Sequence, residues 1–99
     1  MTLSPECLDR LEFLFPHEKN QNEVRRILEE DCSPSCDWFP KEQVDRIRYA
    51  VLRLSRGRLD EFEDAMKLAR TDYRDLLMAA DFGRNVDSYR TWHPRDHAV

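Results

Sequence analysis

Two cysteines and two histidines are the side chains best suited to bind a metal ion. Cys32 and Cys36 are four residues apart, and His93 and His97 repeat that spacing near the end of the chain. Structural zinc sites usually take four such ligands in closely spaced pairs. However, the Cys-x3-Cys spacing is not the commonest one, and Cys32 falls at an expected helix end, where cysteine is often a small core residue. We therefore favour reduced thiols, with a zinc site or a reversible Cys32–Cys36 disulfide as the alternative.

A row of arginines around one tyrosine is the second feature with binding chemistry. Arg46, Tyr49, Arg53 and Arg56 follow three-four-three spacing, which places them on one face of a helix. Arginines beside an aromatic ring can hold phosphates and stack on a base, or bind an acidic protein. We expect a solvated face in which the tyrosine lies along the arginine stems. If the face binds a partner, an acidic protein is favoured over nucleic acid, because the chain has a net charge of −4.

Motifs for catalysis are missing. Gly57 and Gly83 are the only glycines, so the chain has no glycine-rich phosphate loop. No local motif places a nucleophile beside a base. The acidic residues in 60–64 belong to the first turns of a helix, where the helix dipole favours negative charge. We expect no enzymatic activity, no cofactor and no small-molecule substrate.

A helical hairpin in the middle of the chain must position most of these side chains. Its apolar residues recur three or four positions apart, which places them on one helical face. Gly57 interrupts the pattern, because a left-handed residue that ends a helix is most easily a glycine. We therefore expect antiparallel helices over about 41–56 and 59–81. The apolar stripe of the second stays in phase, which allows one long helix. We favour a break near Thr71-Asp72, because Asp72 with Asp75 can cap a new helix.

Shorter helices are expected on both sides of the hairpin. Ser4 before Pro5 suits the start of a helix, and Pro16 ends it. Asn20, with Glu23 three residues later, looks like a capping pair that begins a short second helix.

The fold class that follows is all-α. We expect a compact bundle of four to five short helices, organised as a single domain over residues 1–93. Asn85 is expected to cap the last short helix, and residues 94–99 are expected to form a frayed tail. Charged residues make up 36% of the chain and alternate in sign along the helical segments, which is typical of a folded helical protein rather than a disordered one.

Some apolar residues fall outside the stripe of the hairpin. Leu68, Met78 and Phe82 lie well away from it if the second helix is continuous. We favour an arrangement in which the loop over 32–40 and the last short helix fold back over this second face. Otherwise the patch is exposed and marks the surface of a homodimer or of a partner complex.

Cysteine usage and hydropathy predict where the protein resides. Three cysteines cannot form a complete disulfide framework, which favours a reducing compartment. The chain has neither a positively charged start followed by an apolar segment nor an apolar run of about 18 residues. We expect a cytoplasmic protein that does not bind membranes.

Two segments of the hairpin resemble a family of small uncharacterised bacterial all-helical proteins. The stretch from Ala50 to Gly57 contains a leucine-serine-x-glycine turn, and Ala69 to Leu77 contains an aspartate-aromatic-arginine-aspartate-leucine-leucine helix. The resemblance covers roughly residues 4–82. It implies a bacterial, cytosolic, all-helical protein and carries no activity with it.

Taken together, these features predict a non-enzymatic protein–protein interaction or accessory module of a bacterial cytosolic system. The surplus of apolar and arginine side chains beyond one narrow core stripe is the reason. A metal- or redox-responsive protein that uses Cys32 and Cys36 is the first alternative. A weak nucleic-acid binder that uses the face from Arg46 to Arg56 is the second.

Overall fold

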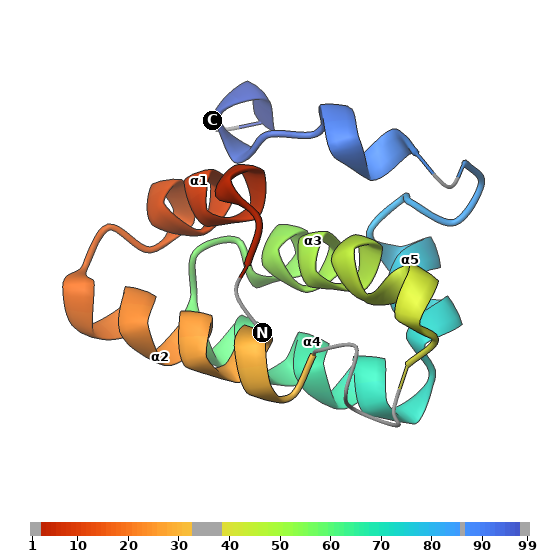
Figure 1. The fold of residues 1–99 in the computed structure, drawn as a ribbon, viewed down its shortest axis with the longest axis horizontal. Coiled ribbons are helices and arrows are strands. Elements are labelled where there is room, and N and C mark those ends of the chain that lie inside the picture. Colours follow the sequence, from red (N-terminus) through yellow and green to blue (C-terminus); the bar gives the residue numbers. More distant parts are fainter. Residues whose placement is uncertain (1–2, 33–38, 86, 98–99) are drawn as a thin grey trace.

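Helix α3 (Val44–Ser55) lies at the centre of an all-helical bundle (Figure 1). The computed structural model describes residues 3–32, 39–85 and 87–97, and no strand occurs among them. The other elements, in chain order, are α1 (Pro5–Leu14), α2 (Glu18–Glu30), the 3₁₀ turn η1 (Lys41–Gln43), α4 (Leu59–Thr71), α5 (Tyr73–Ala79) and the 3₁₀ turns η2 (Ser88–Thr91) and η3 (Pro94–His97). Helix α3 packs against α1, α4 and α5, which confirms the predicted all-α bundle around the hairpin.

Helix α1 begins where the sequence predicts. The hydroxyl oxygen of Ser4 accepts a hydrogen bond from the backbone N–H of Cys7 at 3.2 Å. Pro5 occupies the first helical position, where a missing N–H costs nothing. The helix ends at Leu14, just before Pro16.

The predicted start of the second helix is wrong. Helix α2 begins at Glu18, so Asn20 lies inside its first turn, and the residue before the helix, His17, makes no side-chain capping bond. Glu23 instead pairs with Arg26 at 2.8 Å on the next turn. The carboxylate that was expected to cap the helix is therefore used in an ion pair along its surface.

Helix α3 ends in a left-handed turn of two residues. Arg56 has a φ of 53° and Gly57 a φ of 80°, so the chain turns one residue earlier than predicted. The Ser55 hydroxyl donates to the Leu52 carbonyl at 2.6 Å and closes the last turn. A Cβ atom at Gly57 would lie 2.7 Å from the backbone oxygen of Leu14. Glycine is needed there both for its φ and because α1 approaches so closely.

Asp72 separates α4 from α5, which confirms the predicted break. Its backbone is extended, with a φ of −160° and a ψ of 98°. Its Oδ1 atom accepts hydrogen bonds from the backbone N–H groups of Arg74 at 3.0 Å and Asp75 at 3.4 Å. The side chain thus satisfies two amides at the start of α5 that no carbonyl of the helix can reach.

Two buried arginines of α3 hold the C-terminal ends of neighbouring helices. Arg48 Nε donates to the carbonyls of Cys32 at 2.7 Å and Leu28 at 3.3 Å, at the end of α2. Arg46 Nε donates to the carbonyl of Phe82 at 3.0 Å, just after α5, and a terminal nitrogen of Arg46 donates to the same oxygen. Cations are favourable at these positions, because the last carbonyls of a helix carry partial negative charge.

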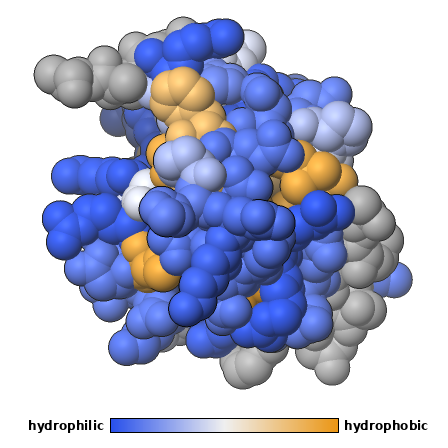
Figure 2. Space-filling view, turned by 90° about the vertical axis from the view of Figure 1, so that its left-hand side faces the viewer, coloured by the Kyte–Doolittle hydropathy of each residue, from blue (hydrophilic) through white to orange (hydrophobic). Residues whose placement is uncertain are grey.

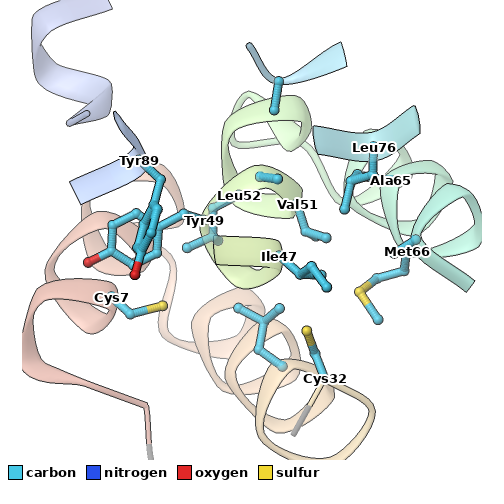
Figure 3. Packing of buried hydrophobic residues seen from close by; sticks show 14 of the residues in the cluster. Cys7, Cys32, Ile47, Tyr49, Val51, Leu52, Ala65, Met66, Leu76 and Tyr89 are labelled. Atoms are coloured by element: carbon cyan, nitrogen blue, oxygen red, sulfur yellow. The ribbon is translucent and has the colours of Figure 1, made fainter. Parts of the chain in front are cut away.

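The apolar stripe of α3 faces α4 and α5. Ile47 and Val51 are fully buried and lie toward Met66 of α4 and Leu76 of α5 (Figure 3). Cys32, at the end of α2, is also fully buried and lies on the same side (Figure 3).

The C-terminal segment covers the side of α3 that carries Tyr49, and not the face with Leu68 and Met78 over which the last short helix was expected to fold. The rings of Tyr49 and Tyr89 meet edge to face, with centroids 4.9 Å apart. Phe82 and Trp92 extend this aromatic cluster, with centroids 6.1 Å apart. Arg10 of α1 donates from Nε to the Trp92 carbonyl at 3.0 Å and ties the segment to the N-terminal part of the chain.

The last residues that the structure describes are also part of the fold. Asn85 Oδ1 accepts a hydrogen bond from the backbone N–H of Asp87 at 2.9 Å, just before η2. Pro94 is buried, and η3 packs on α1. The prediction of a frayed tail is therefore wrong for 94–97, because these residues form η3, which packs against α1.

The expected 32–40 loop is described in part. Residues 33–38, which include Cys36, lie outside the described residues. Phe39 is buried, and its ring meets that of Tyr73 edge to face with centroids 6.3 Å apart.

The two glycines allow a matched test of backbone strain. Gly57→Ala is expected to lower the free energy of unfolding by about 2 kcal/mol or more, because the new Cβ meets a backbone atom at positive φ. In Gly83→Ala the nearest atom to the new Cβ is Met78 Sδ, near the end of a flexible exposed side chain that can move aside. That variant is expected to change stability by less than about 0.5 kcal/mol. Urea denaturation measures both, and equal losses would contradict this account of the turn.

Candidate functional site

The predicted arginine row does not form a solvated face. Arg46 and Tyr49 are only 7% and 3% exposed, so that prediction is wrong. The reason is that the segment ending at Trp92 packs over this side of α3. The Arg53 guanidinium lies over the rings of Phe82, at 5.1 Å, and Trp92, at 5.9 Å. Arg56 alone of the four is exposed, at the end of the helix.

The candidate metal ligands are not assembled in the part of the chain that the structure describes. No group of three or more His, Cys, Asp or Glu residues able to hold a metal occurs among the described residues. Cys36 and the side chain of His97 lie outside them, and Cys32 is buried. His93 accepts a hydrogen bond at Nδ1 from the backbone N–H of Arg95, at 3.0 Å. Its other ring nitrogen is 2.8 Å from Asp9 Oδ2, so both nitrogens are engaged.

Leu68, Met78 and Phe82 do not form one apolar patch. Phe82 is buried in the aromatic cluster, whereas Met78 is 61% exposed. Leu68 is partly buried and borders a hollow of about 230 Å³ between α3 and α4, together with Glu61 and Asp64. The residues predicted to form one surface are therefore divided among the core, α4 and α5. Figure 2 shows, on one face of the molecule, separate orange patches within a mainly hydrophilic surface.

Met78 borders a hollow that also contains a second predicted site residue, Arg46. This hollow, called here the α5 groove, has a volume of about 310 Å³ and lies where η1 and the start of α3 meet α5. Its lining residues are Gln43, Arg46, Tyr73, Arg74, Leu77, Met78 and Gly83. Arg46 and Met78, predicted as members of two different surfaces, are thus brought together.

The end of α5 fixes one border of the groove. Asp81 has a φ of 62°, and its N–H donates to the Met78 carbonyl at 3.1 Å. The N–H of Phe82 donates to the Leu77 carbonyl at 2.8 Å. These paired bonds around a left-handed residue are a common way for a helix to end. They direct the chain back under Met78, whose sulfur comes to lie against Gly83.

The charged residues that line the groove have one sign. Arg46 and Arg74 contribute two guanidinium groups, and no carboxylate is among the lining residues. Arg46 is held in place by the Phe82 carbonyl and by Gln43 Oε1, which accepts from its Nη1 at 3.0 Å. The side chain of Arg74 makes neither an ion pair nor a hydrogen bond with any residue that the structure describes. A locally positive groove therefore occurs in a chain of net charge −4.

Five residues that line the groove were not predicted from the sequence: Gln43, Tyr73, Arg74, Leu77 and Gly83. The predicted helix cap at Asp72 is the sequence feature that could have indicated some of them. Once a helix starts there, Arg74 and Met78 are four residues apart and share one of its faces.

A third hollow, between α2 and α4, is lined by side chains of both charges. It has a volume of about 230 Å³, and Glu63 lies beside Lys67 and Arg70 in its lining. Arg70 already pairs with Asp31 at 3.3 Å. Its charges therefore largely balance one another, unlike those of the α5 groove.

Cys7 is a buried thiol rather than a reactive one. It is fully buried in α1, and its side chain lies near the hydroxyl ends of Tyr49 and Tyr89 (Figure 3). Burial, with the nearby negative charge of Asp45 as a smaller cause, raises the pKa of the Cys7 thiol to about 12. The thiolate that nucleophilic chemistry requires is therefore suppressed at neutral pH.

The chain was compared with models of known protein families, with curated proteins and with solved structures, and none of them matches it. Among the described residues, no helix is long and apolar enough to cross a membrane. Inferences about function therefore depend on the geometry of the chain itself.

The stability of the fold is expected to fall as the pH rises above about 9. Folding raises the pKa of Cys7 from 9.0 to about 12, and burial raises that of Tyr49 from 10.0 to about 12. Between these values the unfolded chain releases protons that the folded chain retains, so the free energy of unfolding decreases with increasing pH. Urea titrations between about pH 8 and about pH 11 measure this slope, which Cys7→Ala and Tyr49→Phe should each reduce.

Thiol labelling gives an independent check on the same residue. At about pH 8 the folded protein should resist alkylation at Cys7, and the urea-unfolded protein should react rapidly, as measured by mass spectrometry of the peptide that contains it. Rapid labelling of the folded protein, or stability that does not change with alkaline pH, would contradict the buried thiol.

Proposed function

We propose that this chain is a non-enzymatic module that binds another protein through the α5 groove. The observation that carries the proposal is the exposed Met78 beside two guanidinium groups, in a hollow whose lining contains no carboxylate. A bacterial cytosolic system is the setting that the sequence resemblance implies, and an accessory role in such a system is part of the proposal.

The composition of the groove supports protein contact. Arginine, methionine and aromatic residues are enriched at protein interfaces, and the groove combines Arg74, Met78 and Tyr73. A methionine side chain can adapt its shape to different apolar surfaces. With a volume of about 310 Å³, the groove is at the lower limit of pockets that enclose small molecules, which favours one side chain of a partner as occupant.

Other functions have less support from the described residues. The raised pKa of Cys7 argues against thiol chemistry at that residue, and both ring nitrogens of His93 are engaged. Of the predicted redox pair, Cys32 is buried and Cys36 lies outside the described residues. The burial of Arg46 and Tyr49 removes half of the arginine row from the surface on which a nucleic acid would lie. Protein binding is therefore favoured over these alternatives.

Site-specific photocrosslinking tests the proposal. A photoreactive amino acid in place of Met78 should give a discrete protein adduct in cells of the source organism, whereas the same group at Glu63 on α4 should not. Adding Arg74→Glu should reduce the adduct by about fivefold or more, because repulsion replaces attraction of the partner. The adduct is identified by mass spectrometry, and twice the mass of the chain would indicate a homodimer.

The control positions are exposed, so the variants should fold normally. Glu63 and Arg74 are both on the surface, and circular dichroism should show unchanged helix content. Identical adducts from positions 63 and 78, or no discrete adduct from position 78, would contradict protein binding through the α5 groove.

A further inference from the structure

We propose that the segment bound in the α5 groove is an acidic peptide, in which one apolar side chain lies about two residues from a carboxylate. The inference rests on the proposed function and adds the chemistry of the partner. It follows from the charges, the burial and the spacing of the groove residues.

The charge of the groove is not compensated within the described part of the chain. Arg74 has no ion pair there, and Arg46 is bonded to a carbonyl and an amide oxygen but to no carboxylate. Some surface cations are paired, as Arg25 is with Glu29 at 2.9 Å and Arg58 with Asp60 at 3.2 Å, whereas others, such as Lys67, also have no ion pair among the described residues. The groove differs in that two guanidinium groups line it without any carboxylate. An anionic group is therefore the complement that the groove lacks.

The two arginines differ in how they can contribute. Arg46 is 7% exposed and already fixed by three hydrogen bonds, so it loses little side-chain freedom when a ligand binds. Because it is largely desolvated, its attraction for an anion is less screened than at the surface. Arg74 is exposed, and no ion pair or side-chain hydrogen bond to another described residue holds it, so its guanidinium group can turn toward a carboxylate. Arg46 therefore provides a fixed positive charge near the ligand, and Arg74 forms the direct ion pair with its carboxylate.

The apolar part of the groove accepts one anchor. Leu77 is buried in its lining, Tyr73 is partly buried, and Met78 lies at its border with its sulfur against Gly83. Movement of the Met78 thioether can adjust the space to a leucine, methionine or phenylalanine of the partner. The specificity of the groove should therefore come from the carboxylate more than from the exact anchor.

The spacing on α5 sets the spacing in the peptide. Arg74 and Met78 are four residues apart on one helix, which separates their backbone positions by about 6 Å along the axis. An extended peptide advances about 3.3 Å per residue, so about two residues cover this distance. We therefore expect the carboxylate at the second position from the apolar anchor.

Selection from a library of random short peptides tests the inference. The intact chain is immobilised, bound peptides are sequenced, and those lost when Met78 is replaced by alanine are taken as groove binders. These are expected to be enriched in Asp or Glu at the second position from a leucine, methionine or phenylalanine. Enrichment of lysine or arginine, or of apolar residues without a carboxylate, would overturn the acidic partner while leaving protein binding by the groove intact.

Charge reversal with a matched control sharpens the test. A selected peptide should bind Arg74→Glu about fivefold or more weakly, and replacement of its carboxylate residue by lysine should restore binding to that variant. Lys67→Glu on α4 makes the same change in net charge outside the groove and should have no effect. Equal losses with both variants would show that only the overall charge matters and would overturn the proposal.

Two other outcomes would count against both the acidic peptide and protein binding through the α5 groove. A library that yields no binder dependent on Met78 would overturn both the acidic partner and the proposed function. Salt-sensitive binding of a single-stranded oligonucleotide, abolished by Arg74→Glu but not by Lys67→Glu, would overturn both in favour of nucleic acid.

Discussion

The structure depends on hydrogen bonds from two buried guanidinium groups of α3 to the carbonyls that end neighbouring segments. Arg48 binds the end of α2, and Arg46 binds the carbonyl that follows α5. A buried cation without acceptors costs several kcal/mol, so these arginines are stable only if both neighbouring segments are in place. Conversely, the carbonyls at a helix end need donors once water is excluded. Each side thus requires the other, and this mutual requirement fixes α2 and α5 relative to the central helix.

Arginine side chains also cover the aromatic side of the core. Arg10 lies over Tyr49 and Arg53 over Phe82, with guanidinium-to-centroid distances of 5.3 and 5.1 Å. In each pair the cation faces the negative side of the ring and covers apolar surface with its stem. A chain with 36% charged residues can therefore build an interior larger than its apolar residues alone would provide. Arg74, the groove arginine without such a role in the described structure, is the exception that the proposed function uses.

Most features decided by neighbours in sequence could be predicted, the start of α2 being an exception, and features decided by distant segments could not. The cap at Ser4, the break at Asp72 and the apolar stripe of the hairpin depend on residues within a few turns. The burial of Arg46 and Tyr49 depends on a segment some forty residues away, and no periodicity within α3 reports it. The groove combines residues from η1, α3 and α5, so the sequence predicted two of its members without placing them together.

The contact between Asp9 and His93 has a consequence for how the chain is made. It joins residues 84 positions apart, in the same region where Arg10 reaches the Trp92 carbonyl. Until Trp92 has left the ribosome, the aromatic face of α3 has no cover, although the helices that carry it are already synthesised. Folding must therefore finish after translation of this segment, because closing so long a loop is a late and slow event. During that interval the aromatic side chains of this face are exposed to water and to other chains, which favours aggregation.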